Sequence, residues 1–376
     1  MAQQWDDSRD ELAAALARYV GYTTGAPYIT RIADVTELFD QSPSRMKIEV
    51  VRTLQRQIEV ARGREHKSAD GIVDFAVGLG LIRRIDRGYL VPRLALTELG
   101  RAYRSARGLD IADYRDFLLQ YSMLQFDADV SGLLLDMALD GPLPSGPELL
   151  GRFEERTREL RRLRSDWLLK AFPSPQLRER LLRGDTGYVV RWIKDARGPA
   201  IEVREIGADF TRHHARPRRG WLTSLGHIRT DGQLTSRGRE LALRLRAGGD
   251  GFFWVGPSRN WFERLHVDPV LIREPLGPAW NIVRPAKAHG SSVPHQVVAS
   301  TADFMERGYR YMRLVRANQV PLQAVKPYIY FLECRLGFRL CADMVFRAVF
   351  RQFETRFAPM SERTGLLGYY QLRRRR

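Results

Sequence analysis

Apolar residues between positions 69 and 106 recur first at helical and then at strand-like intervals. Residues 69–79 predict a short helix, because apolar side chains recur three and four positions apart, at Ile72, Phe75, Ala76 and Leu79. Residues 81–85 and 89–91 are strand-like and flank the turn signal Asp86-Arg87-Gly88, which predicts a β-hairpin. Thr97 then caps a second helix, with Leu99, Ala102 and Tyr103 on one face. Helix, hairpin and helix in this order match the second half of a winged helix-turn-helix domain.

The same order of patterns recurs at residues 215–247. A predicted helix ends at Gly226, and strand-like residues 227–229 and 233–234 flank the turn Thr230-Asp231-Gly232. Thr235 or Ser236 then caps a helix that contains Leu241 and Leu245. The two stretches share a Leu-Gly step before the hairpin and Leu-Thr-x-x-Gly after it. The sequence therefore predicts that one structural unit occurs twice.

The remaining patterns predict helices. They cover residues 45–63, with Ile48, Val51, Leu54 and Ile58 on one face, and then residues 111–139, 300–317 and 321–357. We expect a mainly α fold with small β-hairpins (α+β), built from tandem winged helix-turn-helix domains and a C-terminal helical unit. The predicted divisions are residues 1–110, 111–250 and 251–376.

The net charge of the chain gives information about its binding partner rather than about its fold. The chain has 376 residues, with 61 lysines and arginines against 44 acidic residues, a formal net charge of +17. Such an excess favours a polyanion as partner, and nucleic acid is the usual one, although charge alone does not separate DNA from RNA. Residues 1–20 do not resemble a secretory signal, and no apolar stretch is long enough to span a membrane. These features predict a cytoplasmic, nucleoid-associated protein.

The chain offers no pattern that predicts a cofactor or a metal. Cys334 and Cys341 lie seven positions apart in a segment expected to be helical, about 10.5 Å of rise, which is too far for a disulfide. No histidine lies near them in sequence, so we expect both to be small core residues. The fingerprints of ATPases, zinc proteases and α/β-hydrolases do not occur.

Basic side chains around the two repeated stretches are the candidates for DNA contact, because arginine and lysine bind phosphate and arginine pairs with guanine. Before the first predicted recognition helix and on its hairpin these are Arg62, Arg64, Lys67, Arg83, Arg84 and Arg87, together with the polar Ser68. Around the second they are Arg212, His213, His214, Arg216, Arg218, Arg219 and Arg229. Weaker candidates are Arg158, Arg161 and Arg162, which also fit a solvated helix face, and Arg259 and Asn260 among the aromatic residues Trp254 and Trp261.

Taken together, three stretches resemble the DNA-recognition region of FokI-type type IIS restriction endonucleases. They are residues 68–106, residues 215–228 and the aromatic segment 252–260. The resemblance implies successive winged-helix subdomains that recognise duplex DNA. That family also carries a nuclease domain, whose site needs an Asp and a Glu/Asp-x-Lys on an adjacent strand. The nearest candidates here lack the lysine and a flanking strand pattern: Asp185 with Glu202, and Asp268 with Glu274.

The sequence thus predicts a sequence-specific binder of double-stranded DNA without catalytic residues of its own. The resemblance suggests the targeting component of a bacterial restriction or phage-defence system, with a nuclease or an ATPase on another chain. Two alternatives stay open. One is a divergent Mg²⁺-dependent endonuclease, and the other is a winged-helix transcriptional regulator, which would self-associate on a palindromic site.

Overall fold

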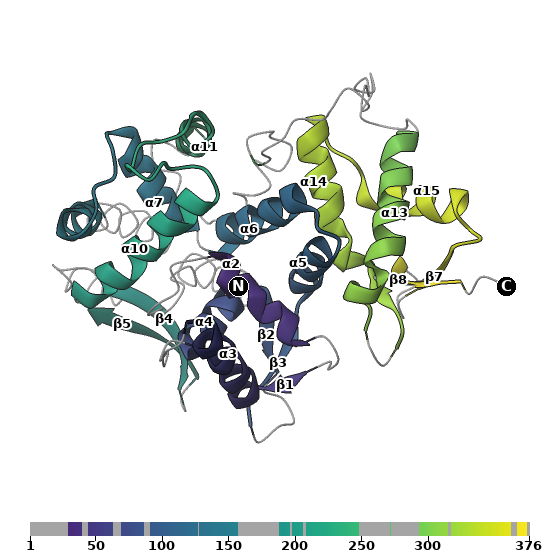
Figure 1. Ribbon diagram of the computed structural model, residues 1–376, viewed down its shortest axis with the longest axis horizontal. Helices are drawn as coiled ribbons and strands as arrows, with labels where there is room; N and C mark the ends of the chain where they lie inside the picture. The colour runs from purple at the N-terminus through teal and green to yellow at the C-terminus, as the bar shows by residue number, and fades with distance from the viewer. Residues whose placement is uncertain are drawn as a thin grey trace, which may run out of the picture. The chain divides into compact units, whose positions relative to one another are not determined.

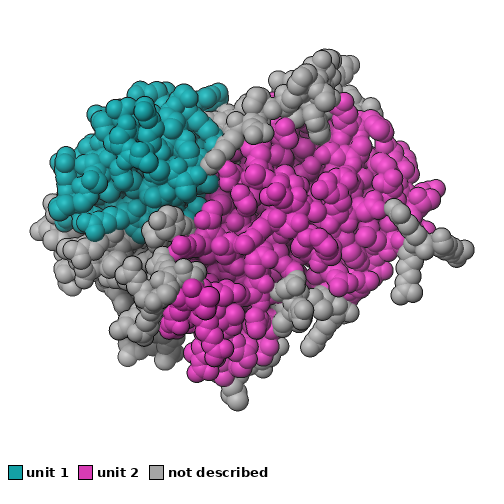
Figure 2. Space-filling view, in the orientation of Figure 1, with its two compact units in different colours: residues 1–29, 122–264 teal, residues 30–121, 265–376 magenta. Residues whose placement is uncertain are grey.

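The structure is a computed structural model in which the chain forms two compact units (Figure 2). Unit 1 comprises residues 1–29 and 122–264, and unit 2 comprises residues 30–121 and 265–376. The described residues are 29–39, 44–62, 69–85, 91–126, 128–156, 188–195, 198–205, 208–247, 271, 293–314, 317–361 and 367–373. They are mainly helical with small antiparallel sheets, which confirms the predicted α+β class at that level.

The first part of unit 2 combines short helices with a small sheet (Figure 1). Its elements are α2 (Ile29–Asp34), η1 (Val35–Phe39), β1 (Arg45–Met46), α3 (Lys47–Arg62), α4 (Ala69–Gly78), β2 (Ile82–Ile85) and β3 (Arg93–Leu96). The strands are antiparallel in the order β1–β3–β2, and β2 pairs with β3 from Ile82 opposite Leu96 to Ile85 opposite Arg93. The predicted apolar face of α4 is confirmed, since Ile72, Phe75, Ala76 and Leu79 are all buried.

Two details of this part differ from the prediction. The second strand of the hairpin is β3 at 93–96 and not residues 89–91, because Leu94 and Leu96 supply its buried side chains whereas Val91 is exposed. Residues 86–90 lie outside the described part of the chain. Ile48, which helical spacing placed on the buried face of α3, is exposed at the start of that helix.

The rest of unit 2 surrounds a helix pair, α5 (Glu98–Gly108) and α13 (His295–Met312). Glycines allow the close approach of these helices: a Cβ on Gly308 would lie 2.5 Å from Ser105 Oγ, and one on Gly108 would lie 2.3 Å from the Tyr311 ring. Tyr311 Oη also donates a hydrogen bond of 2.9 Å to the carbonyl of Gly108. The pair therefore joins segments about two hundred residues apart in the chain.

Aromatic side chains fill the core beside this pair. They come from α6 (Ala112–Phe126), α13 and α14 (Lys326–Leu336). Phe304 stacks on Tyr328 with ring centroids 4.1 Å apart, and Tyr114 meets both rings edge-on. Burial raises the pKa of Tyr114 well above its usual range. Such packing fixes α6 and α14 against α13.

The C-terminal segment corrects two predictions. Besides its helices it contains a small sheet that was not predicted, of β6 (Val320–Pro321), β8 (Leu367–Leu372) and β7 (Phe357–Ser361), in that order, together with η5 (Leu322–Ala324). The continuous helix expected at 321–357 is two helices, because α14 ends at the left-handed residue Gly337 and α15 (Ala342–Gln352) follows. Cys334 is buried as expected, but Cys341 is exposed at the N-cap of α15 and is not a core residue.

Unit 1 is built on α7 (Ala128–Leu139), which packs against α10 (Ala208–Ser224) and α11 (Ser236–Ala247). Leu134, Trp221 and Leu241 are fully buried in this unit. Residues 141–146 separate α7 from a helical segment at 147–156. A long hairpin of β4 (Tyr188–Asp195) and β5 (Gly198–Glu205) precedes α10 and was not predicted.

No helix within the described ranges combines the length and the apolar character that a membrane crossing requires.

Candidate nucleic-acid interface

The end of α4, the β2–β3 hairpin and the start of α5 meet in a tight junction around Gly80, Thr97 and Gly100, which we call the first corner. Gly80 takes the left-handed conformation at φ +68°, which glycine adopts without steric cost. Thr97 Oγ1 accepts a hydrogen bond of 3.0 Å from the Gly100 N–H, which is a helix N-cap, and it lies within hydrogen-bonding distance of the carbonyls of Gly80 and Leu81. Gly100 packs so closely that a Cβ there would lie 2.0 Å from the Leu81 carbonyl oxygen.

The second repeated stretch builds the same corner bond for bond. Gly226 is left-handed at φ +75°. Thr235 Oγ1 accepts a hydrogen bond of 3.0 Å from the Gly238 N–H and lies 2.8 Å from the Gly226 carbonyl oxygen. A Cβ on Gly238 would lie 1.9 Å from the His227 carbonyl oxygen. The predicted repeat is thereby confirmed for the helix end and the cap, and the close glycine contact is a further feature that the two stretches share.

The hairpins of the two corners differ. In the first, β2 and β3 pair through four positions and β1 extends the sheet. In the second, only Ile228 and Leu234 pair, around a closed turn in which the Arg229 N–H donates to the Gln233 carbonyl at 2.8 Å. This turn is also fastened within unit 1, because the Leu143 N–H donates to the Gly232 carbonyl at 2.9 Å. The first hairpin is therefore longer, and the second is held by its own unit.

Acidic side chains with cationic partners lie on α4, the predicted first recognition helix. Lys47 Nζ lies 2.9 Å from Asp70 Oδ1 and 2.9 Å from Asp74 Oδ1, and Arg84 Nη2 lies 2.7 Å from Asp74 Oδ1. Burial alone would lower the pKa of Lys47, but its hydrogen bonds to the two carboxylates outweigh that effect and raise it. The charges on this face thus balance. Lys47, a residue that sequence analysis did not select, joins α3 to α4.

Among the first group of candidates, the described arginines lie on β2. Arg83 and Arg84 are both exposed, and Arg84 makes the ion pair with Asp74 described above. Arg62 is the last residue of α3, but its side chain falls outside the description. Arg64, Lys67, Ser68 and Arg87 lie outside the described residues altogether.

In the second group of candidates, some arginines are exposed to solvent and others contact the protein itself. Arg216 and Arg229 are exposed, and Arg229 Nε lies 3.8 Å from Asp231 Oδ2. Arg219 donates to the Thr230 carbonyl at 3.1 Å and so braces the turn. Arg218 is fully buried, with its guanidinium carbon 4.9 Å from the centroid of the Trp221 ring, and it faces the core of unit 1. Arg212, His213 and His214 lie on α10, but their side chains are not described.

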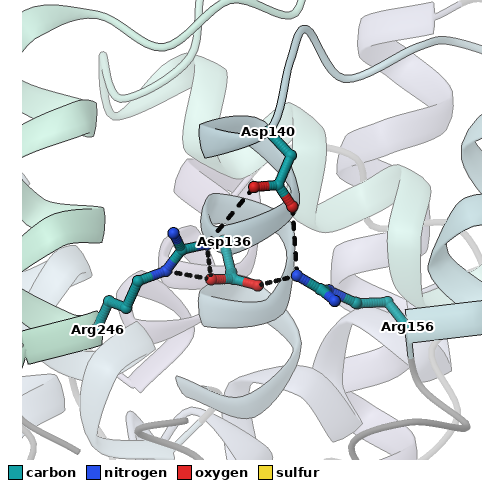
Figure 3. A network of polar contacts seen from close by, with 4 residues as sticks. All are labelled: Asp136, Asp140, Arg156 and Arg246. Carbon is teal, nitrogen blue, oxygen red and sulfur yellow. Dashed lines mark hydrogen bonds and ion pairs between the residues drawn. The ribbon is translucent and has the colours of Figure 1, made fainter. Parts of the chain in front are cut away.

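A buried carboxylate that sequence analysis missed fastens the second repeat to α7. Arg246 of α11 and Arg156 reach Asp136 from opposite sides (Figure 3). Asp136 Oδ1 accepts from Arg246 Nε at 2.8 Å, and Asp136 Oδ2 lies 3.1 Å from Arg156 Nη2. Asp140, directly after the last residue of α7, contacts both arginines as well. The network neutralises a side chain that is 4% exposed, so its role is structural.

The weaker candidates and most of the acidic residues considered for a nuclease site lie outside the described residues. They are Arg158, Arg161, Arg162, Trp254, Arg259, Asn260, Trp261, Asp185, Asp268 and Glu274. Glu202 is on β5, opposite Arg191 of β4, so the expectation that it lacks a flanking strand pattern is wrong. In the part of the chain that the structure describes, no three histidine, cysteine or acidic side chains cluster in a way that could hold a metal ion.

Comparison of the chain with models of known families, with curated proteins and with solved structures gives no match in any of the three.

Proposed function

We propose that the protein binds double-stranded DNA, with residues 29–96 acting as a winged helix-turn-helix domain. The observation that carries this proposal is the order α2, β1, α3, α4, β2, β3, together with the sheet order β1–β3–β2. In such a domain the second helix of the pair α3–α4 enters the major groove, and the β2–β3 hairpin lies against the DNA backbone. α4 is then the recognition helix.

The distribution of charge also supports DNA binding by α4 and the β2–β3 hairpin. The net charge of +17 favours a polyanion, and Arg83 and Arg84 are exposed on the hairpin. Lys47 and Arg84 offset the two carboxylates of α4, so this face does not present net negative charge to phosphates. The Asp70 side chain is 62% exposed near the start of α4, where recognition helices contact base edges. A carboxylate there accepts a hydrogen bond from the amino group of cytosine.

Selection from a random duplex pool near physiological salt, without added metal, tests the proposal. The wild-type protein should enrich one asymmetric sequence of several base pairs. Asp70→Asn should change the preferred base at one position, because an amide pairs with adenine. Asp303→Asn is the matched control, since that carboxylate is equally exposed and also pairs with a basic side chain, Arg307, but on α13.

The outcomes separate the parts of the proposal. Binding that fades with salt and enriches no sequence would overturn sequence recognition while keeping phosphate contact. The absence of any binding to duplex DNA would overturn the proposal as a whole. Stronger binding to duplex RNA than to duplex DNA would mean that RNA is the ligand.

From the motif resemblance we also propose that the protein is the targeting component of a restriction or phage-defence system, with cleavage or ATP hydrolysis on a separate chain. The nuclease alternative predicts Mg²⁺-dependent nicking that Glu202→Ala abolishes. The alternative of a transcriptional regulator predicts that the protein binds a palindromic site as a dimer. An asymmetric site bound by a monomer, without nicking in Mg²⁺, would favour the targeting component over both.

A further inference from the structure

Arg101 on α5 is a buried arginine that lacks a carboxylate partner within the described ranges. Only 9% of its surface is exposed. Its Nη1 donates one long hydrogen bond, of 3.5 Å, to the backbone carbonyl of Arg313. Two partly buried arginines of unit 1 differ in this respect, since Arg156 and Arg246 both pair with Asp136. Arg101 therefore carries a positive charge that makes no close ion pair within the described ranges.

Burial of a charge without a counterion is costly. Burial lowers the pKa of Arg101, the charge of Glu98 opposes that effect, and the nearby charge of Arg83 lowers the pKa further. A guanidinium nevertheless stays protonated at neutral pH. The fold thus keeps a cation where an anion from outside the chain would offset the cost of its burial.

Two exposed arginines flank Arg101 from other elements. Arg83 lies on β2, and the contact between Gly100 and the Leu81 carbonyl brings that part of the chain against α5. Arg313 follows the last residue of α13 and contributes the carbonyl that Arg101 contacts. Its own guanidinium donates to Asn318 Oδ1 at 3.1 Å, which orients it. The charge of Arg83 therefore acts on Arg101, and the backbone carbonyl of Arg313 lies against the Arg101 guanidinium.

We propose that Arg101, flanked by Arg83 and Arg313, binds a phosphate group. The planar guanidinium fork of Arg101 matches two phosphate oxygens, and the nearby charge of Arg83 adds attraction for a phosphate. If the proposed function holds, the ligand is a backbone phosphate of the duplex, and the site extends the DNA contact beyond the hairpin onto α5. A free polyphosphate would be bound by the same chemistry.

Salt-dependent binding of a duplex tests the site. Arg101→Gln should weaken binding about tenfold for all sequences alike, because one charge-assisted contact is lost. It should also reduce the slope of log Kd against log salt by about one phosphate contact. Arg107→Gln is the matched control, since Arg107 lies on the same helix, carries the same charge and pairs with Asp34. An unchanged slope for Arg101→Gln, or an equal loss for Arg107→Gln, would overturn the proposal.

Thermal unfolding provides a readout that does not depend on DNA. Inorganic tripolyphosphate should raise the Tm of the wild type and of Arg107→Gln, but not that of Arg101→Gln. Arg101→Met should keep or raise the wild-type Tm, because it removes an unpaired buried charge. A large fall in Tm for Arg101→Met would make Arg101 a packing residue and would overturn the proposal.

The two proposals fail separately. If duplex DNA does not bind but tripolyphosphate stabilises the wild type and not Arg101→Gln, the phosphate site stands and the DNA proposal fails. If DNA binds equally well to the wild type and to Arg101→Gln, the DNA proposal stands and the phosphate site fails.

Discussion

The corners at Thr97 and Thr235 use the same bonds, yet they support different hairpins. Each has a left-handed glycine at the helix end, a threonine that caps the next helix, and a glycine pressed against a backbone carbonyl. The first corner supports β2, β3 and β1, whereas the second supports a closed turn bonded to Leu143. The corner therefore fixes the helix geometry, and the hairpin is the part that is free to differ in function.

The largest expected effect comes from the network that fastens the second corner to α7. Asp136→Asn should destabilise unit 1 by about 4 kcal/mol, because two arginines lose a buried counter-charge. Urea unfolding, monitored by tryptophan fluorescence to which the buried Trp221 contributes, measures the loss in the free energy of unfolding. Asp140→Asn, an exposed neighbour in the same network, should cost much less. Equal losses would mean that the charge of Asp136 is not what holds the unit together.

Unit 2 also contains a buried carboxylate, which can be compared with Asp136 of unit 1. Glu333 of unit 2 is 2% exposed, accepts a hydrogen bond of 2.7 Å from the Leu340 N–H, and burial raises its pKa to about 7. A raised carboxyl pKa means that the folded state binds the proton more tightly, so this contribution to stability is full below pH 4.5 and falls as the pH rises to 7.

Glu333→Gln removes that titration while keeping an acceptor for the Leu340 N–H. At pH 8 the variant should be more stable than the wild type by about 3 kcal/mol, and at pH 4 the two should be nearly equal. Chemical unfolding at both pH values measures the difference. A difference that does not change with pH would show that the ionisation of Glu333 carries no cost.

The glycines of the two corners should respond alike. Gly100→Ala and Gly238→Ala should each destabilise their unit by about 2 kcal/mol, because the added Cβ meets a backbone carbonyl at 2.0 and 1.9 Å. Gly151→Ala is the control, since nothing lies within 4 Å of its Cβ position and alanine favours the helix. A large difference between the two corner variants would break their equivalence.

The capping threonines should have the smallest effect on stability. Thr97→Val and Thr235→Val should each cost about 1 kcal/mol, because a helix N–H loses its acceptor. Serine at either position keeps the hydroxyl and should be nearly neutral. Urea unfolding of the four variants checks this, and a neutral valine at one corner alone would mean that its cap is replaced by another contact.

The corners could be predicted from the sequence because their signals are local. A Leu-Gly helix end and Leu-Thr-x-x-Gly lie within a few residues of the bonds they make, and each residue type has a backbone reason for its place. The β4–β5 hairpin also had a local signal, since Val189, Val190 and Ile201 flank a turn region, and it was overlooked.

Other features depend on contacts between distant segments. α5 packs against α13 across about two hundred residues, and that packing places Arg101 beside Arg313. Lys47 meets Asp74 across 27 residues. Arg218 belongs to a basic cluster in the sequence, yet it is buried over Trp221. Composition alone cannot separate such an arginine from exposed Arg216, because burial is decided by the fold.

The central claim is the proposal that the first hairpin contacts duplex DNA, and we expect the second, whose turn is bonded to Leu143 within its own unit, to contribute less. Matched substitutions in the two hairpins, Arg83→Gln and Arg229→Gln, test it most directly in salt-dependent duplex binding. Both arginines are exposed, and each variant removes one charge. Arg83→Gln should weaken binding about tenfold and reduce the salt slope by about one contact, while Arg229→Gln should leave both near the wild type. Equal losses, or a larger loss for Arg229→Gln, would contradict the account.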